Sequence, residues 1–193
     1  MFVPPVHRLQ DLRRARPAPA IHWRCLRTTP AQLVERLPEL GSVLYVPMRP
    51  DGTLLREWPR GLLVDMMQLA PLLQTRSLVA AGTITSEGPR EWIECLDREG
   101  RGCARLHLLP DTDYLAWDRL LEHGRATPGN RPSRRLRQPR PVYAKVLRFH
   151  ARRLGGLVVL GAEPCLPISP LGRQVAGQIA QAEAVPLQLA SSD

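Results

Sequence analysis

Lysine is almost absent from this sequence, because only Lys145 among its 27 basic side chains is not an arginine. Aromatic residues are also scarce, at 5% of the chain. The familiar catalytic signatures are missing: we find no GxSxG, GxxxxGK(S/T), HExxH or GxGxxG segment. This excludes the enzyme classes that depend on those motifs. Any catalytic role would have to depend on scattered residues.

Cysteine is infrequent and widely spaced, and no CxxC pair or Cys/His cluster accompanies it. Such spacing fits neither a zinc site nor a dense disulfide framework, so we expect reduced and mostly buried thiols. The chain also has no apolar run long enough for a signal-peptide core or a membrane span. We therefore expect a cytoplasmic protein. The four cysteines are Cys25, Cys95, Cys103 and Cys165.

The residues that are present predict a folded, basic protein. The chain has 193 residues, is 44% hydrophobic and 23% charged, and carries a formal net charge of +9. Guanidinium groups are planar, permanently charged donors that suit carboxylates and phosphates. The expected partner therefore carries acidic groups: a nucleic acid, an anionic surface or a small molecule with carboxylates.

Local signals predict the first elements. Thr29, Pro30 and Gln32 form a capping-box arrangement at the start of a helix that Gly41 ends. A strand at residues 43–46, a Pro-Asp-Gly turn and a second strand at 53–56 predict a hairpin. Pro47 favours an edge position or a bulge for the first of these strands.

A second hairpin and a helix follow further along the chain. We expect strands at residues 76–85 and 92–96. The segment Asp-Arg-Glu-Gly then forms a turn, and residues 103–109 form the returning strand of the hairpin. On the returning strand Arg105 and His107 share one face. They could form a cationic and imidazole pair, or could both face solvent on an exposed sheet.

The helix after this hairpin is expected to be capped by Asp111 or Thr112. Its expected apolar stripe consists of Tyr114, Trp117, Leu120 and Leu121. Periodicity does not decide whether residues 142–154 form a helix or the first arm of a hairpin. Residues 157–160 predict a strand, and residues 169–184 predict a terminal helix. Because strands come in hairpins and do not alternate with helices, the predicted fold class is α+β with an antiparallel sheet flanked by helices.

Three segments within this region occur in a recognisable order: WIECLDREG at 92–100, RLHL at 105–108 and DTDYLAWDRL at 111–120. The order resembles a module of the HemS-type haem-trafficking family, in which an Asp-x-x-Gly turn, a returning strand, an acidic cap and a helix with Ala-Trp follow one another. Upstream, LGSV at 40–43 and LVD at 63–65 resemble further segments of that family. The resemblance covers residues 33–124.

The resemblance implies four parts of the chain. A basic, Pro- and Arg-rich segment at 1–28 precedes the HemS-like module at 29–127. A basic linker or loop at 128–141 and a C-terminal extension at 142–193, packed on the module, follow.

The resemblance also implies a site for b-type haem, bound non-covalently because the chain lacks CxxCH. In the family one histidine ligates the iron and arginines lie near the propionates. His7, in the stretch PVHRL, is the expected iron ligand, and His107 is a further candidate. Arg49, Arg56 and Arg105 are the expected propionate partners.

The implied function is that of a hemin carrier, which receives imported hemin and passes it to haem-import or haem-oxygenase partner proteins, with homodimerisation left open. One alternative is reductive haem degradation. Another is a nucleic-acid or anionic-surface binding module that uses residues 131–140, and a third is a module that acts only as a protein partner.

Overall fold

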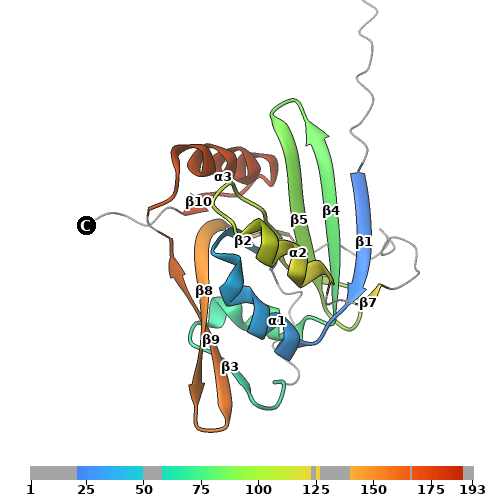
Figure 1. Ribbon diagram of the computed structural model, residues 1–193, viewed down its shortest axis with the longest axis vertical. Coiled ribbons are helices and arrows are strands. Elements are labelled where there is room, and N and C mark those ends of the chain that lie inside the picture. Colours follow the sequence, from blue (N-terminus) through green and yellow to red (C-terminus); the bar gives the residue numbers. More distant parts are fainter. Residues whose placement is uncertain (1–20, 50–57, 123–124, 127–139, 166, 189–193) are drawn as a thin grey trace, which may run out of the picture.

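The computed structural model describes residues 21–49, 58–122, 125–126, 140–165 and 167–188. Within these ranges one ten-stranded sheet organises the protein (Figure 1). Its strands are β1 (Ile21–Arg27), β2 (Ser42–Pro47), β3 (Leu62–Val64), β4 (Ser77–Thr85), β5 (Gly88–Leu96), β6 (Gly102–His107), β7 (Arg125–Ala126), β8 (Ala144–Leu154), β9 (Leu157–Pro164) and β10 (Leu187–Gln188).

The strands lie in the order β3-β9-β8-β2-β6-β5-β4-β1-β7, and β10 pairs with β8 beside this path. Every pairing is antiparallel except those of β3 with β9 and of β10 with β8. The predicted α+β class with a mostly antiparallel sheet is therefore confirmed.

Helices cover the two faces of the sheet unequally. The first face, which carries Leu26, Ile93 and Leu106, packs against most of the helical elements. The second face, which carries Leu44 and Val146, packs against one helix near β2 and β8. The first-face elements are α1 (Pro30–Arg36), η1 (Leu37–Leu40), η2 (Met67–Gln74) and α2 (Tyr114–Glu122), and the second-face helix is α3 (Pro170–Ala182).

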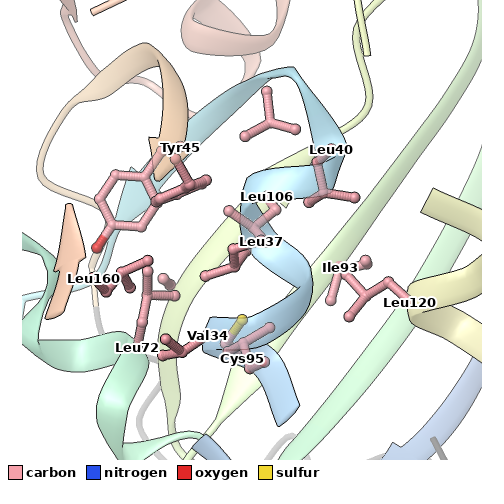
Figure 2. Close-up of a cluster of buried hydrophobic side chains, with 14 of the residues drawn as sticks. Val34, Leu37, Leu40, Tyr45, Leu72, Ile93, Cys95, Leu106, Leu120 and Leu160 are labelled. Atoms are coloured by element: carbon pink, nitrogen blue, oxygen red, sulfur yellow. The ribbon is translucent and has the colours of Figure 1, made fainter. Parts of the chain in front are cut away.

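The main core lies between the first face and the helices above it. Figure 2 shows Leu37 lying over Leu106, and Ile93 pointing toward Leu120 of α2. These four side chains are 3% exposed or less, and burying each one contributes roughly 1.5–3 kcal/mol. This core holds α2 against β5 and so determines where α2 lies relative to the edge of the sheet.

Predictions that depend on neighbouring residues are confirmed. Thr29 caps α1, where its side chain accepts from the Gln32 N–H and the Gln32 side chain accepts from the Thr29 N–H. In the turn between β5 and β6, the Asp97 carboxylate accepts from the N–H groups of Glu99 and Arg101. Both arrangements satisfy backbone donors locally and need no distant contact.

The cap of α2 differs from the prediction. Asp113 accepts from the Ala116 N–H, whereas the Thr112 hydroxyl joins Leu109 to Ser42. Asp111 reaches instead to Ser169 at the start of α3. Tyr114 is 53% exposed and so does not belong to the buried stripe. The cap position shifts because the fold uses the preceding acidic and hydroxyl groups for tertiary contacts.

The expected edge position of β2 is wrong. The strand lies between β6 and β8 in the middle of the sheet, and Pro47 is its last residue, where a missing N–H does little harm. The predicted Pro-Asp-Gly turn and the strand at 53–56 lie outside the described residues. Residues 144–154 form the first arm of a hairpin with β9, which resolves the earlier ambiguity.

Both flanking parts of the chain contribute strands to the sheet. β1 begins at Ile21, inside the segment interpreted from sequence as basic and proline-rich, and pairs with β4 along its whole length. β8 lies beside the central strand β2. The terminal helix is confirmed, with Ser169 as its N-cap. Among the described residues, no helix is long and apolar enough to cross a membrane.

Candidate ligand-binding groove and a buried charge cluster

A groove of about 380 Å³ lies on the first face, between α2 and the strands β1, β4 and β5. Trp117 and Leu121 form its helical wall, and the open strand ends of the sheet form its floor. In Figure 1 these three strands extend beyond α2, which leaves this part of the face without a helix above it. The volume falls in the range of small-molecule sites, roughly 300–1,000 Å³.

Three paired residues on neighbouring strands of the groove floor carry, in order, an imidazole, no side chain and a carboxylate. His22 of β1 is opposite Gly82 of β4, which is opposite Glu91 of β5. Because Gly82 has no side chain, the space between His22 and Glu91 stays open. A Cβ at Gly82 would meet only Glu91 Cγ at 3.6 Å and Arg90 O at 3.7 Å, which are ordinary contacts.

Arg24 gives the groove hydrogen-bonding capacity. Arg24 lies two residues along β1 from His22, on the same face and exposed. Trp117 is 2% exposed, and its indole Nε1–H has no hydrogen-bond partner among the described residues. A buried donor without a partner is costly. The groove therefore offers an imidazole, a guanidinium and a carboxylate beside an apolar helical wall.

A cluster of charged side chains lies on the second face, beneath the C-terminal end of α3. Arg105 donates to Glu183 Oε2 at 2.6 Å and to Glu94 Oε1 at 3.4 Å. All three side chains are at most 22% exposed. Of the two alternatives for Arg105 and His107, exposure to solvent is wrong, because α3 and the residue after it cover this face of β6.

His107 lies beside Arg105 and is 5% exposed. Its ring stacks on Trp92 with a centroid distance of 6.3 Å. Burial and, secondarily, the nearby Arg105 guanidinium lower the pKa of His107 to about 3. The imidazole is therefore neutral at physiological pH, and its 3.8 Å distance from Glu183 is neither a hydrogen bond nor an ion pair.

Comparisons with known proteins give a partial likeness. No family model matches the chain, and no curated protein matches it significantly. Solved structures do match. Two of these are of ChuS from Escherichia coli, described as a haem-degrading enzyme and as a haem oxygenase. Each is 19% identical with a TM-score of 0.40, covering 57% of this chain and 36% or 37% of ChuS.

A third match is PhuS from Pseudomonas aeruginosa, described as a haem-binding protein. It is 21% identical with a TM-score of 0.37, covering 63% of this chain and 39% of PhuS. The chain thus spans less than two fifths of the length of each of these structures.

The structure separates the site residues expected from sequence. His7 and Arg56 lie outside the described residues, so their roles stay predictions. Arg105 and His107 lie together, but on the face opposite the groove and beneath Glu183. Arg49 is exposed just after β2, where its N–H donates to Arg140 O. Since Val46 is the partner of Arg105, Arg49 lies roughly 10 Å further along the strand direction.

Sequence reasoning did not select His22 or Arg24 as site residues. Both lie within residues 21–26, where IHWRCL alternates in character without proline or glycine. That alternation is the usual signal of a half-buried strand, but the arginines and prolines before it obscured it. Among the described residues, no group of three His, Cys, Asp or Glu side chains could hold a metal ion.

Proposed function

We propose that this protein is a cytoplasmic haem carrier that binds haem non-covalently in the groove beside α2. The observation that supports this proposal is the meeting of His22, Arg24 and the apolar wall of α2 around one open space. Haem is flat and largely apolar, carries two carboxylates and takes an axial imidazole. The sequence pattern of residues 33–124 independently suggested the same ligand.

The groove residues fit that ligand by chemistry. His22 would hold the iron through its imidazole, and the missing side chain at Gly82 would leave room beside it. Arg24, about 7 Å from His22 along the strand, would pair with a propionate. Trp117 and Leu121 would shield one side of the ring from water.

A hemin titration of the purified full-length apo-protein tests the proposal. We expect a shifted Soret band that saturates at one hemin per chain. His22→Ala should weaken binding at least about tenfold, which corresponds to 1.4 kcal/mol. Gly82→Leu should weaken it similarly by filling the groove. Its Cβ meets only ordinary contacts, so the thermal midpoint should change little.

The matched control is His150→Ala, which removes a half-exposed imidazole from β8, far from the groove. It should leave the titration unchanged. His7→Ala and His107→Ala belong in the same series. If either abolishes the Soret shift while His22→Ala and Gly82→Leu do not, the groove is not the site. Absence of any Soret shift would contradict haem binding altogether.

A further inference from the structure

The outer edge of β1 is open over most of its length. β1 pairs with β4 at all seven of its positions, but on its other side only Leu26 and Arg27 pair, with β7. Residues 21–25 therefore have no partner strand on that side within the described part of the chain. A strand edge of this kind offers a row of backbone donors and acceptors to another strand.

Apart from the charges of Arg24 and Arg27, this edge lacks the features that normally prevent strand pairing. Its register with β4 is continuous, without a bulge, and the strand contains neither proline nor lysine. On the second face it exposes two large apolar side chains, Ile21 at 46% and Trp23 at 39%. The opposite edge of the sheet is formed by β3, which has only three residues and so offers a much shorter edge for pairing.

We propose that a second copy of this chain pairs antiparallel with residues 21–25, around a two-fold axis at Trp23. Such an axis pairs residues that lie on the same face of the sheet. Trp23 then lies opposite the partner's Trp23, and Ile21 lies opposite the partner's Cys25. The pairing uses all five open positions and ends where β7 begins.

The charges on the strand favour this register. With the axis at Trp23, each Arg24 lies opposite the partner's His22 and not opposite another guanidinium. Moving the axis to Arg24 would place two guanidinium groups opposite each other and would extend the pairing into positions that β7 occupies. Moving it to His22 would leave Cys25 outside the pairing. Of these three registers, only the one with its axis at Trp23 pairs all five open residues and places apolar side chains opposite one another on the second face.

The pairing would also change the groove, a consequence that rests on the proposed function. His22 and Arg24 lie on the first face of β1 and line the groove. In the pair, the partner's Arg24 would lie beside His22. Each groove would then have two guanidinium groups near its imidazole, one for each carboxylate of a dianionic ligand.

Cysteine cross-linking of the full chain tests the register without any ligand. Paired antiparallel residues have Cα atoms about 4.5–5.5 Å apart, which lies within the range of disulfides. Trp23→Cys should form a disulfide-linked dimer on mild oxidation. Ile21→Cys should do so as well, through the partner's native Cys25. The wild-type chain is the control, because its Cys25 lies opposite the partner's Ile21 and should not cross-link.

Sedimentation velocity gives the second readout. The wild-type chain should show a concentration-dependent dimer, and Trp23→Lys should be monomeric with an unchanged circular dichroism spectrum. A wild-type chain that stays monomeric at all concentrations overturns the proposal, as does a dimer that neither engineered cysteine cross-links. If removing residues 1–20 were needed for dimerisation, the N-terminal segment and not a second copy would occupy the edge. A monomer that binds hemin would refute the pairing and leave the proposed function standing.

Discussion

The guanidinium of Arg105 lies 2.6 Å from the carboxylate of Glu183, a contact that joins a central strand to the residue capping α3 across 78 positions of sequence. Glu94 of the neighbouring strand shares the same guanidinium. One cation thus serves two largely buried carboxylates. Together with the hydrogen bond from Arg90 to Gln178, the contact connects the sheet to the C-terminal half of α3.

Replacing Arg105 with methionine should destabilise the protein strongly, because two carboxylates would lose their counter-ion. Breaking a buried ion pair by removing one partner costs roughly 3–5 kcal/mol, and chemical denaturation would measure it. The control is Arg101→Met, whose guanidinium is 39% exposed in a turn and whose loss should cost less than about 1 kcal/mol. Equal costs for the two variants would contradict a special role for Arg105. Adding Glu183→Met to Arg105→Met should recover part of the loss.

His107 should make stability depend on pH in a defined window. Its pKa is lowered to about 3 in the folded protein, whereas an unfolded histidine titrates near 6.5. Between these values the unfolded chain binds the extra proton. The free energy of unfolding should therefore fall as pH drops from about 6.5 toward 3, by up to about 1.4 kcal/mol per pH unit.

His107→Gln should remove this contribution, and denaturation of both proteins at several pH values would measure it as a difference. His150→Gln is the matched control, since its side chain is 48% exposed. A stability difference between wild type and His107→Gln that stays constant from pH 7 to pH 4 would show that His107 titrates normally in the folded state.

Asp111 and Gly172 should be energetically coupled. The Asp111 carboxylate accepts from the N–H and hydroxyl of Ser169, the N-cap of α3. A Cβ at Gly172 would overlap this carboxylate and crowd Ile168. Asp111→Ala should cost about 1.5–3 kcal/mol, because it removes hydrogen bonds to a charged group, and Gly172→Ala should also destabilise.

In the Asp111→Ala background, Gly172→Ala should cost much less, since the main obstruction is gone and alanine favours a helix by about 1 kcal/mol over glycine. A double-mutant cycle from denaturation curves measures the coupling. Simple additivity of the two effects would show that the carboxylate moves freely out of the way.

Only one of the four thiols should react quickly in the native protein. All four cysteines are free, and Cys25 alone is only partly buried. Burial raises the pKa of Cys103 to about 12 and raises that of Cys95 further, so neither forms a thiolate near neutral pH. Thiol titration with a chromogenic disulfide should show one fast equivalent, and Cys25→Ser should abolish it. Two or more fast equivalents would contradict the burial of the others.

The sequence by itself determined the elements whose hydrogen bonds close within a few residues. The Thr29 capping box and the Asp97 turn each satisfy backbone groups with neighbouring side chains, so their residue types alone predicted them. The burial of Trp117 also followed from periodicity, since helical spacing decides which side chains share a stripe.

The tertiary structure alone decided where those elements meet. Arg105 and His107 alternate correctly on β6, yet alternation cannot say which face a helix from 70 or more residues away will cover. His22 became a candidate because β1 joined β4 at the edge and placed it beside Gly82. Strand order and helix placement depend on long-range burial, summed over many side chains. No local sequence pattern contains this information, so the candidate site could be identified only from the fold.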